Sequence, residues 1–292
     1  MRSDAPVLLG IDAGGTKVHV RWASVDGTVI EDRVVRELGW GAASFVDRAA
    51  VVAGLAAERP VRAIGIGSHG CDSDAECEDL RSRVAAQVPV PVAVVNDAEL
   101  LGHAVGRPHA INVVLGTGSI VVHRGSGEAR YLGGWGWLVG DDGSAWGLVR
   151  NAVAALSDGV DVRSSESDPL QELLLTASGS SSLRDLVDVM QTSPASEWAS
   201  WADAIFAVES ESAAAQTAID LGVSRTARLV ERVRALSAQA DHVVFAGGVV
   251  ANQRGYAARL EAAVRDRTGL QATVLDGPPV AGAVRLAAAV AD

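Results

Sequence analysis

The sequence predicts an α/β protein in which two lobes repeat one fold. Two glycine-rich turns carry this prediction, because residues 12–17 and residues 116–119 each follow an apolar strand and precede a second strand. A chain of 292 residues is also long enough for about two ordinary domains. We therefore expect an N-terminal lobe over 1–109, a C-terminal lobe over 110–279, and a last helix over about 280–292 that packs back on the first lobe.

The first lobe is expected to open with three antiparallel strands. Residues 7–12 are apolar and run into a glycine turn, residues 18–22 alternate, and an Asp-Gly turn leads into residues 29–35. The next apolar spacings predict, in order, a helix over 45–57, a strand over 61–67, a helix over 79–87, a strand over 90–95 and a helix over 96–105.

A similar order of elements begins again after residue 110. The expected elements are strands over 111–115, 119–124 and 128–132, a long helical region that includes 144–156 and 209–236, a strand over 242–246, a helix over 254–267, a strand over 272–275 and a helix over 280–291. One glycine turn alone is weak evidence. Because two of them open two similar units, we expect them to hold one phosphate chain between the lobes.

The composition is that of a globular protein, and we expect the protein to be cytoplasmic. The chain is 48% hydrophobic and 21% charged, and its 36 acidic against 25 basic residues give a net charge of −11. Broad contact with nucleic acid or an anionic membrane needs clustered positive charge, so neither partner is expected. The chain start shows no apolar signal segment, and no apolar run approaches the ~20 residues of a membrane span.

The first glycine turn has the composition of a phosphate-binding loop. Gly14 and Gly15 lack a Cβ, so the backbone of this turn, which continues with Thr16 and Lys17, could approach phosphate oxygens closely. Asp12 could hold Mg²⁺ through water, since Mg²⁺ usually keeps several of its waters. The alternative is a hairpin turn with a capping aspartate, and this turn alone does not decide between the two.

Two further glycine motifs fit the same nucleotide. The second turn offers hydroxyl and N–H groups to phosphates, although a plain hairpin turn would look alike. A glycine pair ends the apolar strand at 242–246, where a flat adenine ring could lie on the backbone. The residues of these two motifs are Gly116, Thr117, Gly118, Ser119, Gly247 and Gly248.

A candidate catalytic carboxylate follows the apolar strand that ends at residue 95. The next residues are Asn96 and Asp97, at the start of an expected helix. An aspartate there can simply cap the helix, but open α/β sheets also place ligands at the carboxyl ends of their strands. If Asn96 is the cap, Asp97 is free to point into a cleft.

The segment 133–144 combines glycines, tryptophans and acids, and it is followed by Trp146. Aromatic faces suit the apolar side of a pyranose, and carboxylates suit its hydroxyls. Core packing is the alternative for any single tryptophan, and we prefer it for Trp146. For the turn with Gly134 and Trp135 we favour a binding role, because turns lie on the surface and carry binding residues.

Taken in this order, the motifs resemble those of the N-acetylglucosamine kinase / BadF-BadG-BcrA-BcrD ATPase family, in the superfamily of actin, hexokinase and heat-shock ATPases. The resemblance covers essentially the whole chain, and 133–144 is its most specific part. It implies a duplicated actin-like (ribonuclease H-like) ATPase fold with a central nucleotide cleft. It also implies an ATP-dependent sugar kinase that uses ATP and Mg²⁺. We further expect a homodimer.

The resemblance implies roles for individual residues. Asp97 would be the base that takes the proton from the sugar 6-hydroxyl, and Asp12 would serve Mg²⁺. The glycine motifs would bind the nucleotide. The residues expected at the sugar are Asn96, Asp97, Thr117, Gly134, Trp135, Asp141 and Asp72. N-acetylglucosamine is the first candidate substrate and glucosamine the second.

Two positions depart from the family pattern. Residues 39–44 contain no Asn, where acetylhexosamine kinases of the family usually have one that bonds sugar hydroxyls, so the exact sugar stays open. Asp142 stands where Glu is common. In a nearby loop, His69 and Asp72 could contact the sugar or could only shape the loop.

Three other functions are compatible with parts of the pattern. A dehydratase-activating ATPase of the same family would share the phosphate loops but needs an iron–sulfur cluster across a dimer, and Cys71 and Cys77 match no such arrangement. A sugar-responsive regulator would need a DNA-binding extension before the first strand. A silent sugar-binding protein would not need the carboxylates of a catalyst.

Overall fold

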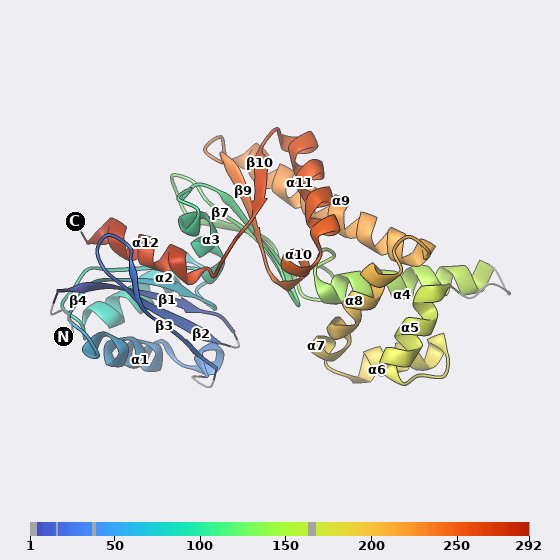
Figure 1. Ribbon diagram of the computed structural model, residues 1–292, viewed down its shortest axis with the longest axis horizontal. Helices are drawn as coiled ribbons and strands as arrows, with labels where there is room; N and C mark the ends of the chain where they lie inside the picture. Colours follow the sequence, from blue (N-terminus) through green and yellow to red (C-terminus); the bar gives the residue numbers. More distant parts are fainter. Residues whose placement is uncertain (1–4, 16, 37–38, 163–167, 292) are drawn as a thin grey trace.

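The computed structural model describes residues 5–15, 17–36, 39–162 and 168–291. Two five-stranded sheets with helices packed around them make up most of this part of the chain (Figure 1). The predicted α/β class is confirmed. Of the helices in the described part, none is long and apolar enough to cross a membrane.

The first sheet has the strand order β3-β2-β1-β4-β5. Strands β1 to β3 pair antiparallel, and β4 and β5 continue the sheet parallel to β1. Their bounds are β1 Val7–Ala13, β2 Val18–Ala23, β3 Val29–Val35, β4 Val61–Ser68 and β5 Val92–Val95. The parallel strands end at the same edge of the sheet, and this edge carries the first group of site residues.

The second sheet repeats the first. Its order, β10-β9-β6-β7-β8, is that of the first sheet when β6 to β10 are matched with β1 to β5. The strand directions repeat as well, with an antiparallel β6-β7-β8 meander and parallel β9 and β10. The bounds are β6 Ile111–Leu115, β7 Ser119–Arg124, β8 Ala129–Gly133, β9 His242–Ala246 and β10 Gln271–Val274. This repetition is the duplication that the two glycine turns predicted.

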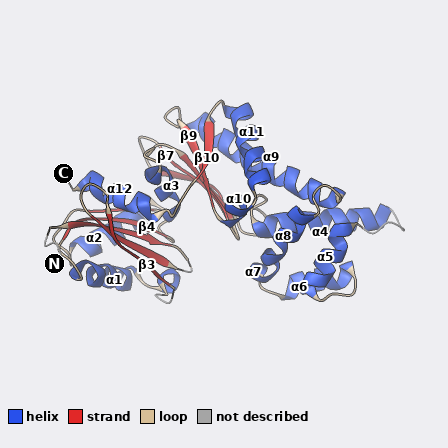
Figure 2. Cartoon of the chain, in the orientation of Figure 1, coloured by secondary structure: helices blue, strands red, loops and turns tan. Residues whose placement is uncertain are grey.

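Helices cover the sheets and form a separate end of the molecule. The first-lobe helices are α1 Phe45–Ala57, α2 Asp74–Ala85 and α3 Leu100–Ala104, with 3₁₀ turns η1 Trp40–Ala42 and η2 Asp97–Glu99. The others are α4 Ala145–Val162, α5 Pro169–Ser178, α6 Leu183–Thr192, α7 Ala195–Trp198, η3 Ala199–Trp201, α8 Ala202–Ala207, α9 Ala213–Leu236, α10 Gly248–Asn252, α11 Arg254–Thr268 and α12 Val280–Val290. Figure 2 shows that α4 to α8 form an all-helical region beyond the second sheet.

The last helix returns to the first sheet, so both chain ends lie in the same lobe (Figure 1). α12 packs on β1 and β4. It approaches so closely that a Cβ on Gly65 would lie 2.1 Å from the carbonyl oxygen of Ala283. This is the packing expected of the last helix. We propose the lobe boundaries at residues 109 and 279 on the same basis.

A short helix joins the two lobes. Leu100 of α3 packs against α12 residues, and Leu101 packs against Val244 of β9. Arg124 of β7 adds ion pairs to Glu99, at 2.6 Å, and to Asp74, at 2.7 Å. These contacts run beside η2 and therefore fix the position of its first residue, Asp97, between the sheets.

Two first-lobe helices differ from their predicted bounds. α2 begins at Asp74 rather than 79, because the Ser73 hydroxyl accepts a hydrogen bond from the Glu76 N–H and so caps the helix earlier. The helix expected over 96–105 is a 3₁₀ turn followed by the five-residue α3.

Candidate active site

Three polar side chains meet at the edge of the first sheet. Asp12 lies near the end of β1, His69 follows β4, and Asp97 follows β5 after one intervening residue. β1 pairs with β4, and β4 pairs with β5. The carboxyl ends of these parallel strands therefore bring the three side chains together, as in other open α/β sheets. Nδ1 of His69 lies 3.9 Å from Oδ2 of Asp97.

Asn96, not Asp97, caps η2. The Asn96 side chain accepts a hydrogen bond from the Ala98 N–H, and the Glu99 side chain accepts one from the Asn96 N–H. The Asn96 amide also donates to Cys71 O and to Asp72 Oδ1, at 3.2 and 3.0 Å. Asn96 is thus buried and engaged within the lobe, whereas the Asp97 side chain is 27% exposed.

Burial makes both carboxylates of this group more basic than usual. It raises the pKa of Asp12 to about 7, with the negative charge of Asp97 adding to the shift and Lys17 opposing it. Burial also raises the pKa of Asp97, while His69 opposes the rise and Asp72 adds to it. Two neighbouring carboxylates with raised pKa values favour a bound cation or an accepted proton between them.

This group fits a Mg²⁺ site of the kind that relies on few protein ligands. No group of three or more His, Cys, Asp or Glu side chains able to hold a metal occurs among the described residues. Mg²⁺ commonly uses one or two carboxylates together with waters and substrate phosphates. Burial disfavours the ionised form of Asp12, so a cation at this edge would stabilise that form.

The first glycine turn is tight and lies beside His69. The Gly14 N–H donates to the Lys17 carbonyl at 3.0 Å, which closes the turn between β1 and β2. A Cβ on Gly15 would lie 3.6 Å from the His69 ring. Lys17 is exposed, and the predicted phosphate ligand Thr16 lies outside the described residues.

The second glycine turn is tied to the start of α4. The N–H of Ala145 donates to Gly116 O at 2.9 Å, and the N–H of Trp146 donates to Thr117 O at 3.3 Å. A Cβ on Gly116 would meet no atom within 4 Å, so this backbone leaves open surface on which a phosphate can lie.

The glycine pair after β9 lies against the second turn. Gly247 has a φ of 109°, and a Cβ on it would lie 2.3 Å from Leu115 O. No side chain other than hydrogen could be accommodated there. At Gly248 a Cβ would meet nothing within 4 Å, so the backbone is open. The structure therefore brings these two predicted nucleotide motifs together.

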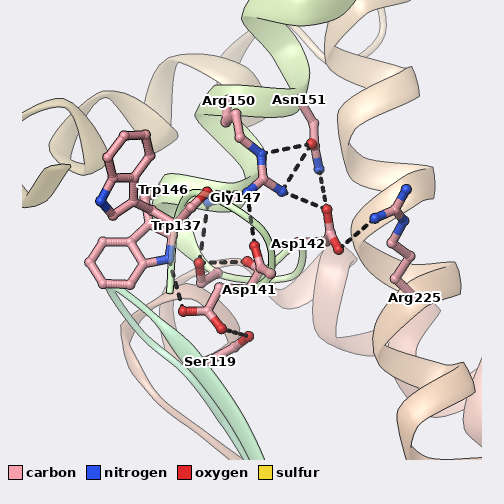
Figure 3. Close-up of polar contacts among 11 residues, drawn as sticks. Ser119, Trp137, Asp141, Asp142, Trp146, Gly147, Arg150, Asn151 and Arg225 are labelled. Carbon is pink, nitrogen blue, oxygen red and sulfur yellow. Dashed lines mark hydrogen bonds and ion pairs between the residues drawn. The ribbon is translucent and has the colours of Figure 1, made fainter. Parts of the chain in front are cut away.

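Asp141 is held in the loop between β8 and α4, where Figure 3 shows its contacts. Its carboxylate accepts hydrogen bonds from Trp146 Nε1 at 3.1 Å and from Ser119 Oγ at 3.4 Å. It has a φ of 59° and is the one described residue other than glycine with a positive φ. Burial raises the pKa of Asp141, and the hydrogen bonds from Ser119 and Trp146 oppose the rise. Such a strained, buried carboxylate is typical of a functional site.

The neighbouring Asp142 anchors this loop to two helices. Its carboxylate pairs with Arg150 of α4 at 2.6 Å and with Arg225 of α9 at 3.0 Å (Figure 3). Arg150 also donates to the carbonyls of Trp137 and Gly140. Arg150 was not among the predicted residues, and only its partly buried position on an amphipathic helix could have suggested it.

Trp135 and Trp137 differ in exposure. Trp135 is 77% exposed, and the flanking Gly134 has a φ of 70° that turns the chain outward. Trp137 packs edge-on against Trp198, with ring centroids 5.6 Å apart. The expected binding role of Trp135 remains a prediction, and its exposure excludes the alternative of core packing.

Arg48 is a second positioning residue that sequence reasoning missed. It is 4% exposed, and it donates to Trp40 O at 3.1 Å and to His69 O at 2.9 Å. Its guanidinium lies 5.4 Å from the centre of the Trp40 ring. An arginine within the otherwise apolar face of α1 was the available signal. Arg48 thereby fixes the loop that carries His69 and Asp72.

The predicted residues thus form two groups, one on each lobe. The first group consists of Asp12, Gly14, Gly15, Lys17, His69, Asp72, Asn96 and Asp97. The second group consists of Gly116 to Ser119, Gly134, Trp135, Asp141, Gly247 and Gly248. Within the described part of the chain, no hydrogen bond or ion pair joins the first group directly to the second.

The second group borders a cavity of about 450 Å³, which is of ligand-binding size. Ser119, Trp135 and Asp141 line it on one side, and α9 lines it on the other. Another cavity, of about 470 Å³, lies between α4, α5 and the start of α9, and none of the predicted residues lines it. The cavity lined by Ser119, Trp135 and Asp141 is therefore the candidate for substrate binding.

Comparison with known sequences gives one family match and one curated relative. The sequence model of the BadF/BadG/BcrA/BcrD ATPase family matches residues 9–284. The N-acetylmuramic acid/N-acetylglucosamine kinase of Clostridium acetobutylicum is 27% identical over 168 residues, which are 53% of this chain and 55% of the relative. The match thus spans about half the length of that curated relative.

Comparison with solved structures identifies the fold. A candidate N-acetylglucosamine kinase from Chromobacterium violaceum aligns over 97% of this chain and 99% of its own, with a TM-score of 0.69 and 23% identity. A ROK family glucokinase from Streptomyces griseus, solved with glucose and AMPPNP, aligns over 97% of this chain and 99% of its own, with a TM-score of 0.57 and 18% identity. These likenesses confirm the predicted actin-like fold.

Proposed function

Since this chain belongs to the BadF/BadG/BcrA/BcrD ATPase family, we propose that it is an ATP-dependent kinase of a hexose or amino sugar, with N-acetylglucosamine phosphorylated at its 6-hydroxyl as the first candidate reaction. The name of the clostridial relative favours an N-acetylated amino sugar. Glucosamine is the second candidate, because residues 39–44 lack the Asn usual in acetylhexosamine kinases.

The observation that carries the proposal is the position of Asp97. Asn96 caps η2, so the Asp97 carboxylate, which accepts a bond from the Ala98 N–H, is not needed as the cap and lies at the carboxyl end of β5. Burial raises the pKa of Asp97, and a general base works best when its pKa lies near the operating pH. Asp97 is therefore suited to accept the proton of a sugar hydroxyl.

The proposed reaction is an in-line phosphoryl transfer. Asp97 takes the hydroxyl proton while the sugar oxygen bonds to the γ-phosphorus, and the bond from that phosphorus to the ADP oxygen breaks. ATP with Mg²⁺ supplies the phosphoryl group. Asp12 would hold the cation through water, and the open backbones of Gly116 and Gly248 would receive the phosphates and the adenosine. Closure of the two lobes would bring both groups of site residues to the reacting atoms and exclude water.

The loop from Gly133 to Gly143 is proposed to hold the sugar. Asp141 offers a carboxylate whose geometry Ser119 and Trp146 fix, and Trp135 offers an exposed aromatic face. On the first lobe, the Asn96 amide donates a hydrogen bond to Asp72 Oδ1 at 3.0 Å. If both side chains contact the sugar, this bond must be shared with a sugar hydroxyl or replaced by bonds to it.

A coupled measurement of ADP release tests the proposal. The purified protein is assayed with ATP, Mg²⁺ and one sugar at a time from N-acetylglucosamine, glucosamine, N-acetylmannosamine, glucose and N-acetylmuramic acid. We expect release above the sugar-free rate, greatest with an N-acetylated amino sugar, and a product phosphorylated at the 6-hydroxyl. Sugar-independent ATP hydrolysis with none of these sugars active would contradict the kinase and favour a non-kinase ATPase of the same family.

A further inference from the structure

The cavity beside the proposed sugar loop has an arginine-rich wall that the proposed reaction does not use. Arg225, Arg228 and Arg232 of α9 line it. Their spacing of three and four residues places them on one face of the helix. All three are exposed, in a chain whose net charge is −11. This concentration of positive charge therefore contrasts with the negative net charge of the chain.

Two of these arginines have no partner in the part of the chain that the structure describes. Arg225 pairs with Asp142 at 3.0 Å. Among the described residues, neither Arg228 nor Arg232 takes part in a hydrogen bond or an ion pair. The acids of the opposite wall are already engaged, since Asp142 also binds Arg150 and Asp141 accepts bonds from Trp146 and Ser119. The cavity is thus left with unneutralised positive charge on the α9 side.

The opposite wall carries two proposed sugar contacts and one residue of the second glycine turn. Trp135, Asp141 and Ser119 border it. Of the nucleotide glycines that the structure describes, Gly116, Gly118, Gly247 and Gly248 lie outside its lining. An anion bound by Arg228 and Arg232 would therefore lie next to the sugar loop rather than on the open backbone of Gly116 and Gly248.

We propose that Arg228 and Arg232 bind the carboxylate of an acidic substituent on the sugar, so that the substrate class extends to carboxylated amino sugars. This inference rests on the proposed sugar kinase function. An arginine fork matches a carboxylate in geometry and charge, and such charge-assisted bonds are among the strong ones. A neutral sugar would use the Trp135 and Asp141 wall alone and would leave the two arginines in water.

The test compares two sugars that differ only in the acidic group. N-acetylmuramic acid is N-acetylglucosamine with a lactyl ether that ends in a carboxylate. Its kcat/KM relative to that of N-acetylglucosamine is measured for the wild type, for the double variant Arg228→Gln/Arg232→Gln, and for the control Arg184→Gln/Arg265→Gln. The control removes two exposed positive charges from α6 and α11, outside the cavity.

We expect the selectivity ratio to fall about tenfold or more in the Arg228→Gln/Arg232→Gln variant, because hydrogen bonds to charged groups are among the stronger ones, and to stay unchanged in the control. An equal change for both sugars, or no change while N-acetylglucosamine is still turned over, would overturn the inference. Competition by inorganic phosphate would also overturn the inference, if phosphate displaced N-acetylmuramic acid with the same affinity as N-acetylmuramic acid itself. The cavity would then be a general anion site.

A binding measurement separates this inference from the proposed function. N-acetylmuramic acid is titrated calorimetrically into the wild type and the two double variants, without ATP. Tighter binding to the wild type and to the control than to Arg228→Gln/Arg232→Gln supports the arginine site even if no sugar is phosphorylated. Equal binding to all three overturns it even if N-acetylglucosamine is a good substrate.

Discussion

Trp146 donates its indole N–H to the carboxylate of Asp141 across 3.1 Å. The donor comes from the first turn of α4, and the acceptor from the loop just before it. A Cβ on Gly118 would lie 2.6 Å from the Trp146 ring and 3.0 Å from Asp141 Oδ2, so this pair also packs directly on the second glycine turn. This bonded pair thereby packs the proposed sugar contact against the proposed phosphate loop.

Replacement of this donor should weaken sugar binding more than stability. Trp146→Phe keeps most of the ring but loses the indole N–H, and a hydrogen bond to a charged group contributes about 1.5–3 kcal/mol. We expect the sugar KM to rise about tenfold, since Asp141 is then held by Ser119 and backbone groups alone. Steady-state kinetics check this. Trp137→Phe is the control, because its indole nitrogen makes no hydrogen bond among the described contacts, and a similar KM for both variants would contradict the role of Trp146.

Trp135→Ala should affect the sugar and not the fold. The side chain is 77% exposed, so its removal creates no cavity. An aromatic contact of this kind contributes about 1 kcal/mol beyond burial, which corresponds to roughly a fivefold rise in sugar KM. Leu138→Ala, at a neighbouring position that is 69% exposed, should leave KM unchanged. If the cognate sugar changes the intrinsic fluorescence of wild type and Trp135→Ala equally, Trp135 does not border the sugar.

Asp12 should make the metal-free protein less stable as pH rises. Its pKa is raised from 3.8 to about 7, so between these values the folded state keeps a proton that the unfolded state has lost. Stability is therefore lost as pH rises through this window, by at most about 4 kcal/mol. Asp12→Asn has no such proton to lose. In urea unfolding with EDTA and no nucleotide, the free energy of unfolding of Asp12→Asn should rise relative to that of the wild type from pH 4 to pH 7.

The control, Asp26→Asn, should show the opposite pH dependence of its stability difference from the wild type. Hydrogen bonds from Ser24 and Thr28 hold the pKa of Asp26 below its usual value, so its contribution is present at neutral pH and fades on acidification. The free energy of unfolding of Asp26→Asn should therefore fall relative to that of the wild type as pH rises. A stability difference for Asp12→Asn that does not vary with pH would show that the Asp12 carboxylate is not desolvated.

Local patterns sufficed for most of the strands. The predicted bounds 29–35, 111–115, 119–124 and 242–246 agree with β3, β6, β7 and β9, because each is an apolar or alternating run between turn residues. Helix starts were less predictable, since the start of α2 depends on the Ser73 cap rather than on apolar spacing. The helices α5 to α8 lie in a region where the sequence indicated helix without separate elements.

The candidate site could be predicted only where chemistry is local. Glycine turns, the Asn96-Asp97 pair and the tryptophan-rich loop are adjacent in sequence, so their types and spacing could be interpreted directly. Arg48 and Arg150 were missed because their partners are distant backbone carbonyls. Trp146 packs partly on the core, as expected, but its bond to Asp141 depends on the positive φ that the loop adopts there.

The central claim is that Asp97 is the base of a sugar kinase, and the turnover of Asp97→Asn tests it most directly. Asn keeps the shape and can still accept the 3.1 Å bond from the Ala98 N–H, while Asn96 continues to cap η2. Loss of a general base typically costs about 10²–10⁴ in rate. We predict a fall of that order in kcat, with little change in sugar KM or in the melting temperature. Turnover near that of the wild type would contradict the assignment of Asp97.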